Sequence, residues 1–294
     1  MQKPSLDTQR LGLYAKLVRL NKPIGILLLL WPTLWALFVA ADGIPDITVL
    51  VVFIIGVVLT RSSGCAINDY ADRKIDRFVG RTRDRPLAAG LIHPKEALMV
   101  SAILASIALF MALVFLNKLT IMFALGAAFL AASYPFMKRF HFLPQVHLGI
   151  AFAFSIPMAF TAITNTFPPP VAWLMFTAAV IWTTAYDTLY AMVDREDDIK
   201  IGVKSTAILF GNMDKAAVGM LQILVILCLV LVGIRAELGW VYYVGLTVAS
   251  LCFIYQQLLI KHRLPDRCFE AFLNNNYFGM LVFLGIFTHY LISK

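Results

Sequence analysis

The chain carries little charge for its length. Only 14% of its 294 residues are charged and only 17 are acidic, whereas 60% are hydrophobic. The mean hydropathy is +0.80. This scarcity of charge excludes a soluble domain with an ordinary solvated surface and places the chain among membrane proteins.

Cysteine and histidine are also scarce. The four cysteines, at positions 65, 228, 252 and 268, show no CxxC spacing, and the five histidines show no ligand spacing. Neither a disulfide framework nor a zinc site is therefore indicated, and the cysteines are expected to be small packing residues. The first apolar run, at about 18 residues, exceeds a signal-peptide core and is interpreted as a retained helix.

Long apolar runs, by contrast, are plentiful. A bilayer-spanning helix needs about 20 residues. The sequence predicts an all-α, polytopic membrane protein that forms a single domain over residues 1–294. Its nine expected transmembrane helices are 22–41, 46–68, 96–116, 119–137, 146–164, 170–190, 214–234, 237–260 and 270–291.

Basic residues predict the orientation of these spans. With a cytoplasmic N-terminus, nearly every lysine and arginine lies on the inner side; Lys118, Arg235 and Lys294 lie outside, and Arg61 lies within a span. An odd number of spans leaves the C-terminus outside. Residues 1–21 are expected to form a basic amphipathic segment on the inner leaflet. Topology alone explains the net charge of +8, so nucleic acid binding need not be invoked.

The few acids are concentrated at the ends of apolar runs. In the stretch NDYADRKID, Asn68, Asp72 and Asp76 recur every four residues, which places them on one face if the stretch is helical. Oxygen ligands in this arrangement suit Mg²⁺, which binds through carboxylates together with substrate phosphates. The alternative is a solvated acidic cap on a membrane loop.

A second acidic stretch, YDTLYAMVDREDD, closes the sixth predicted span. Asp187, Asp194 and Asp198 again share a helical face. Tyr190, Asp194 and Asp198 follow the three residues of the first set at a constant offset of 122, so residues 68–76 and 190–198 form a weak internal repeat. Repeats of this kind place a site between two halves of a membrane protein, which disfavours the solvated-cap interpretation.

Basic side chains accompany both acidic stretches. Arginines in residues 77–87 could offset the charge of a bound diphosphate. Arg61 lies seven residues before Asn68 on the same helical face and could bind a substrate carboxylate deeper in the membrane. A snorkelling side chain or a structural ion pair is the alternative for Arg61.

Taken together, NDYADRKID, RTRDRPLAAG, YDTLYAMVDREDD, GVKSTA and SYPFMKR resemble the UbiA family of intramembrane prenyltransferases. The resemblance runs from about Arg19 to the C-terminus. It implies nine helices around a lipid-open cavity capped by cytoplasmic loops, in a bacterial inner membrane, with the N-terminus cytoplasmic and the C-terminus periplasmic.

The resemblance also implies roles for individual residues. Asp187 would lie on the wall nearer the acceptor, and Arg61 would hold the acceptor's carboxylate. The Mg²⁺ and diphosphate ligands would be Asn68, Asp72, Asp76, Asp194 and Asp198, and these aspartates with Asp187 form the expected catalytic set. Residues expected to bind diphosphate or close the cap are Arg73, Arg81, Arg85, Lys138, Arg139 and Lys204.

The implied reaction is the Mg²⁺-dependent transfer of a polyprenyl group from polyprenyl diphosphate to 4-hydroxybenzoate, ortho to its hydroxyl, in ubiquinone synthesis. Membrane lipid is the expected surroundings, and no protein partner is indicated. One alternative keeps the reaction but changes the acceptor to dihydroxynaphthoate, haem or a chlorin. Another is a membrane transporter, which predicts acids at midplane depth, whereas here they cluster at one boundary.

Overall fold

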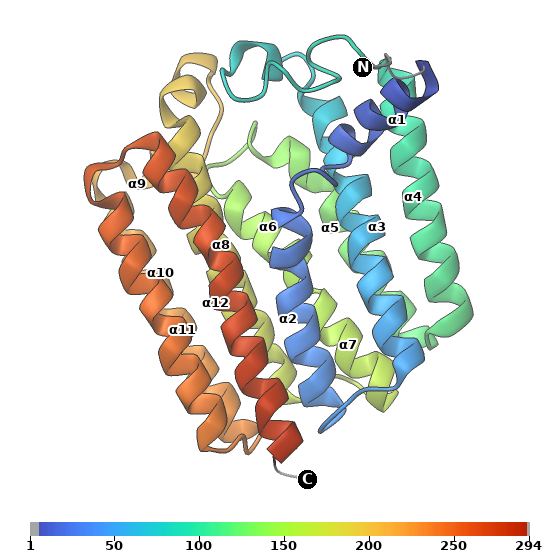
Figure 1. The fold of residues 1–294 in the computed structure, drawn as a ribbon, viewed down its shortest axis with the longest axis vertical. Coiled ribbons are helices and arrows are strands. Elements are labelled where there is room, and N and C mark those ends of the chain that lie inside the picture. The colour runs from blue at the N-terminus through green and yellow to red at the C-terminus, as the bar shows by residue number, and fades with distance from the viewer. Residues whose placement is uncertain (1–5, 293–294) are drawn as a thin grey trace, which may run out of the picture.

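The structure is a computed structural model that describes residues 6–292, so the first five residues of the predicted amphipathic segment and Lys294 lie outside it. Within this range every regular element is a helix, and the predicted all-α class is confirmed (Figure 1). The elements are α1 (Leu6–Leu17), α2 (Ile24–Ala40), α3 (Ile47–Asp72), η1 (Asp76–Phe78), α4 (Pro94–Phe115), α5 (Lys118–Met137), α6 (Pro144–Ala153), α7 (Ser155–Thr164), α8 (Pro170–Ile201), α9 (Thr206–Phe210), η2 (Gly211–Met213), α10 (Asp214–Arg235), α11 (Trp240–Leu259), η3 (Ile260–His262) and α12 (Pro265–Ile292).

Seven helical segments among the described residues are long and apolar enough to cross a membrane. The other two predicted spans coincide with α2, which has only 17 residues, and with α8, which has 32 and carries the second acidic stretch. The predicted span 146–164 consists of two helices, α6 and α7, that meet at Phe154. Pro157 explains the break, because proline has no N–H to donate to the carbonyl of Ala153.

The helix α8 forms the centre of the bundle. It packs against α6, α10 and α12, and Met175, Trp182 and Leu189 along it are fully buried. The peripheral helices α4 and α5 instead expose apolar side chains, with Phe110 64% and Phe129 73% accessible. Such surfaces are expected where helices face lipid.

The N-terminal helix α1 packs on the protein itself. Leu17, at its end, is buried against Leu87, Ile92 and Ala97, which belong to the loop after α3 and to the start of α4. The sequence predicted an amphipathic segment on the inner leaflet. Part of the apolar side of this segment covers the protein's own cap, while Leu11 is 68% exposed.

Figure 1 shows α1, the loop that contains η1, and α9 at one end of the bundle, whereas α12 ends at the opposite end. The end that carries α1 also carries the C-terminal ends of α3, α5 and α8. Both acidic stretches of the sequence therefore meet at the same end of the molecule.

Candidate functional site

The first acidic stretch is only partly helical. The helix α3 ends at Asp72, and Asp76 begins the short helix η1, so the expected single helical face over Asn68, Asp72 and Asp76 is wrong. The chain turns at this point, where the Ile75 amide donates to the Asp72 carbonyl at 2.7 Å. The Thr82 hydroxyl, from the following loop, donates to the Asp76 carbonyl at 2.9 Å and stabilises the turn.

Both acidic stretches nevertheless line one cavity of about 140 Å³. Its walls come from the end of α3, the loop after it, the end of α5, and the last turns of α8. The predicted site residues that line it are Asn68, Asp72, Asp76, Arg81, Arg85, Lys138, Asp187, Asp194, Asp198 and Lys204. On α8, Asp187, Asp194 and Asp198 belong to one continuous helix, as the spacing predicted.

Asp72 is buried, with 2% of its side chain exposed. One carboxylate oxygen accepts a hydrogen bond from Lys138, at the end of α5. The other oxygen, Oδ1, is buried and has no hydrogen-bond partner. A buried carboxylate oxygen without a partner is costly, so this atom is suited to accept a ligand that enters the cavity.

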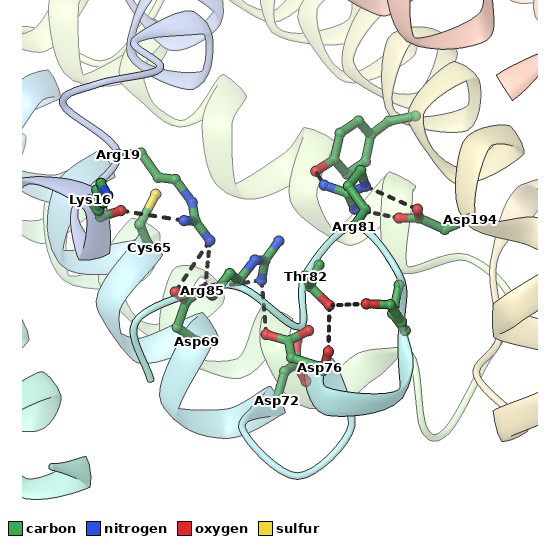
Figure 2. A network of polar contacts seen from close by, with 12 residues as sticks. Lys16, Arg19, Cys65, Asp69, Asp72, Asp76, Arg81, Thr82, Arg85 and Asp194 are labelled. Atoms are coloured by element: carbon green, nitrogen blue, oxygen red, sulfur yellow. Dashed lines mark hydrogen bonds and ion pairs between the residues drawn. The ribbon is translucent and has the colours of Figure 1, made fainter. Parts of the chain in front are cut away.

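Arg85 connects Asp76 to a second buried acid, Asp69. Its Nη1 lies 2.9 Å from Asp76 and 3.0 Å from Asp69 (Figure 2). Asp69 also accepts a hydrogen bond at 2.9 Å from Arg19, in the turn that follows α1. The N-terminal segment is thereby linked to the site through three ion pairs.

Arg81 connects the two acidic stretches directly. Its Nε donates to Asp194 at 3.0 Å (Figure 2). Its guanidinium stacks over the Tyr190 ring at 4.3 Å. Burial alone would lower the pKa of Arg81, but Tyr190 and Asp194 raise it on balance. The guanidinium stays charged and holds the loop after α3 against α8.

Asp198 faces the same cavity from the last turn of α8. Burial, followed by the nearby Asp194 carboxylate, raises the pKa of Asp198 to about 7. Both causes act against the charged form of the carboxyl group. A cation in the cavity would have the opposite effect and favour ionisation.

Arg61 lies deeper, in the middle of α3. Its Nη1 contacts the Cys65 sulfur at 3.2 Å, and the guanidinium lies over the Phe152 ring at 5.6 Å. Within the described residues Arg61 forms no ion pair, and its buried Nε has no hydrogen-bond partner. Gly25 gives it room, because a Cβ there would lie only 2.7 Å from the guanidinium.

Two predicted basic residues lie outside this cavity. Arg73 donates to the Tyr70 carbonyl at 2.6 Å and lines a separate hollow on the other side of the turn. Arg139 donates to the Ala71 carbonyl at 2.9 Å. Lys204 lines the cavity, while its Nζ donates to the Phe140 carbonyl at 3.0 Å and so ties two cap loops together.

The donor set of the cavity suits a hard cation. Carboxylate and amide oxygens from α3, η1 and α8 share its wall, and Oδ1 of Asp72 is buried and unpaired. In the described part of the chain, however, no three His, Cys, Asp or Glu side chains are placed to hold a metal ion. Lys138, Arg81 and Arg85 pair separately with Asp72, Asp194 and Asp76. The ligand chemistry fits Mg²⁺, and its binding requires these side chains to rearrange.

Sequence reasoning missed several residues of the site. Asp69 lies within the recognised motif without a role of its own, and Arg19, its partner, is 50 residues away. A buried charge at the end of a span was the available signal, because it needs a partner. Tyr134 and Thr82 also line the cavity, and nothing in their local pattern distinguishes them from ordinary boundary residues.

Comparison with known proteins identifies the family. The model of the UbiA prenyltransferase family matches residues 29–284, which is most of the chain. The chain belongs to the UbiA prenyltransferase family. This family assignment confirms the resemblance that was seen in the sequence motifs.

Curated relatives of this UbiA-family chain are similar over nearly their whole length. The 4-hydroxybenzoate octaprenyltransferase of Saccharophagus degradans is 56% identical over 96% of this chain and 93% of its own. The protein of the same name from Aeromonas hydrophila is 54% identical over 98% of this chain and 100% of its own.

Solved structures share the fold of this UbiA-family chain. The apo structure of a UbiA homolog from Aeropyrum pernix K1 has a TM-score of 0.79 and 24% identity, covering 89% of this chain and 97% of its own. A UbiA homolog from Archaeoglobus fulgidus bound to GPP and Mg²⁺ has a TM-score of 0.66 and 22% identity, covering 93% and 99%. At this identity the likeness concerns the fold.

Proposed function

We propose that this chain transfers a polyprenyl group from polyprenyl diphosphate to the ring carbon ortho to the hydroxyl of 4-hydroxybenzoate, the aromatic precursor of ubiquinone. The observation that carries the proposal is the cavity in which two acidic stretches meet four basic side chains at one end of a membrane-spanning bundle. The name of relatives that are more than half identical supports the choice of acceptor.

The basic residues supply the electrostatics of the first step. Ionisation breaks the allylic C–O bond, and negative charge accumulates on the leaving diphosphate. Arg81, Arg85 and Lys138 line the cavity where this charge develops. Charged donors that are fixed in advance stabilise such charge strongly in a dry site.

Asn68, Asp72, Asp76, Asp194 and Asp198 would hold Mg²⁺ in this cavity. Bound there, the ion would supply positive charge that offsets the charge of the leaving diphosphate. In the structure Asp72, Asp76 and Asp194 are paired with Lys138, Arg85 and Arg81. These three cationic side chains would bind the diphosphate once the carboxylates hold the metal.

Arg61 would bind the carboxylate of the acceptor. It is buried in α3, has no ion pair among the described residues, and has Asp187, Tyr134 and Tyr186 as electrostatic neighbours. A bidentate guanidinium–carboxylate contact would place the phenol ring between Arg61 and the diphosphate cavity. The allylic carbon then forms a C–C bond with the ring, and the ring carbon gives its proton to a nearby base or to the released diphosphate.

The surroundings of the site exclude water from the reactive cation. The walls below the cavity belong to the apolar core, with Trp182, Tyr186 and Leu189 buried on α8. An allylic cation survives only where water is kept away. We place the protein in the bacterial inner membrane, with the site and the N-terminus cytoplasmic and the C-terminus periplasmic.

A membrane assay tests this function. Membranes containing the protein are incubated with geranyl diphosphate, Mg²⁺ and 4-hydroxybenzoate, with dihydroxynaphthoate as the competing acceptor and EDTA as the blank. We expect a Mg²⁺-dependent 3-geranyl-4-hydroxybenzoate product. Product with the naphthoate alone would move the protein to another quinone pathway, and no product with either acceptor would contradict the proposal.

A further inference from the structure

A second cavity lies on the opposite side of the acidic turn. Its volume is about 350 Å³, and none of its lining residues lines the candidate site. Asp72 and Asp76 face the candidate site, whereas the residues next to them in sequence line this second cavity, which we call the basic hollow. The basic hollow is formed by Arg73, Lys74, Arg77, Leu87, Gly90, Ile92, His93 and Pro94.

The basic hollow has cationic side chains and no acidic side chain in its wall. In the described part of the chain, Lys74 and Arg77 form neither an ion pair nor a side-chain hydrogen bond. Arg73 is fixed by stacking on the Tyr70 ring, at 4.1 Å, and by its hydrogen bond to the Tyr70 carbonyl. Positive charge without a counter-charge in a concave site favours an anion.

The position of the basic hollow defines the kind of anion. Pro94, in its wall, starts α4, whose apolar segment is only 6% buried and faces lipid. The basic hollow therefore lies where a membrane-spanning helix leaves the bilayer, at the depth of the headgroups. Phe78 and Leu91, each adjacent in sequence to a lining residue, are 75% and 59% exposed. Exposed apolar side chains beside cations are typical of a membrane interface.

The first turns of α4 continue this surface into the bilayer. Met99 and Ile103 are 57% and 51% exposed, and Ser101 is buried against Ser63 of α3. One face of α4 is thus held by α3, and another remains free for acyl chains. A ligand with an anionic head and apolar tails matches both parts of this surface.

We propose that the basic hollow binds the phosphate of an anionic membrane phospholipid, whose acyl chains lie along α4. Lys74 and Arg77 supply the charge that selects an anionic headgroup, and Arg73 supplies an oriented guanidinium. The lipid would brace the turn between α3 and η1 from outside, on the side away from the candidate site. Free diphosphate shares this phosphate chemistry and is the competing source.

Lipid binding to the purified full-length protein in a neutral detergent tests the proposal. Retention of phosphatidylglycerol and of phosphatidylcholine is titrated by native mass spectrometry, in parallel with a titration of sodium diphosphate without lipid. We expect saturable retention of phosphatidylglycerol over phosphatidylcholine. Each surface cation contributes attraction to anionic lipid, so Lys74→Gln/Arg77→Gln should weaken phosphatidylglycerol binding about tenfold or more.

Two further variants make the result specific. Arg83→Gln/Lys261→Gln removes the same charge from exposed positions outside the basic hollow, and it should change binding less than about twofold. Lys74→Arg/Arg77→Lys keeps the charge and should retain binding, which separates loss of charge from misfolding. Equal weakening in the two double-glutamine variants, equal retention of phosphatidylcholine, or displacement of the lipid by equimolar diphosphate would overturn the proposal.

Discussion

Arg81 and Asp194 form an ion pair that joins the loop after α3 to α8, with Nε of Arg81 3.0 Å from Oδ1 of Asp194. The two residues are 113 positions apart in the sequence. This pair brings the halves of the acidic repeat to one cavity. It also occupies a carboxylate that we assign to Mg²⁺, so the contact must open when metal and diphosphate bind.

Replacing Arg81 tests its role toward the diphosphate. Arg81→Lys keeps the charge but removes the planar guanidinium, which can donate two parallel hydrogen bonds to phosphate oxygens. We therefore expect the KM for the prenyl diphosphate to rise about tenfold while the KM for the acceptor changes little. Steady-state kinetics with each substrate varied in turn measures both values. Arg83→Lys, in the same loop with a side chain 68% exposed, is the matched control and should behave as the wild type. An equal rise in both KM values would contradict the assignment.

The carboxylates of the two stretches should be required separately. Asp72→Asn and Asp194→Asn each remove one charge from the proposed metal ligands, and we expect kcat to fall about a hundredfold or more in each. Turnover is measured across a Mg²⁺ titration, with near-UV circular dichroism as the check on folding. Asp84→Asn, whose side chain is 90% exposed, controls for loss of an acid from the same region. Wild-type Mg²⁺-dependent rates in either site variant would contradict a metal site that needs both acidic stretches.

Arg61 should act on the acceptor alone. Arg61→Ala is expected to raise the KM for 4-hydroxybenzoate about tenfold or more, because a charge-assisted pair with its carboxylate is lost, and to leave the KM of the prenyl donor nearly unchanged. In the wild type, a phenol without the carboxylate should have a higher KM than 4-hydroxybenzoate. In Arg61→Ala the two acceptors should have similar KM values. Matching effects on donor and acceptor would instead indicate a structural role.

Asp69 should contribute to stability through the N-terminal segment. Its side chain is 2% exposed and is paired with both Arg19 and Arg85, so Asp69→Asn leaves Arg19 without its acidic partner and Arg85 with Asp76 alone. We expect a loss of about 3 kcal/mol or more, seen as a lower Tm and faster proteolysis of the segment around α1. Arg10→Gln breaks the exposed pair with Glu96 in the same segment and should lower the Tm far less. Similar Tm values in the two variants would contradict the proposed link.

The membrane-spanning architecture could be predicted because it depends on local composition. Apolar runs identify spans directly, and each predicted span corresponds to described helices, including the interrupted one at Phe154. The sharing of one cavity by the two acidic stretches also followed from spacing and orientation. These features need no knowledge of distant contacts.

The pairing of charges could not be predicted, because it depends on the tertiary fold. The helix α3 ends at Asp72, and the turn after it is held at Asp76 by hydrogen bonds from Thr82 and Arg85 of the following loop. Helical spacing therefore overestimated the length of the helix. Likewise, the sequence offers many cations for each carboxylate. Only the tertiary fold shows that Lys138 forms an ion pair with Asp72 and that Arg19 forms one with Asp69.

The unequal lengths of α3 and α8 give the two walls of the site different mechanical stiffness. The helix α8 continues without interruption to Ile201, so Asp194 and Asp198 are carried on a rigid rod anchored in the membrane core. Asp76 and Arg81 are carried on a turn and a loop whose polar contacts with α8 include the Arg81–Asp194 ion pair and the Gly80–Asp197 hydrogen bond. We therefore expect the segment after Asp72 to move when the donor enters and when diphosphate leaves. We expect α8 to stay in place and to keep its carboxylates fixed relative to the reacting carbon.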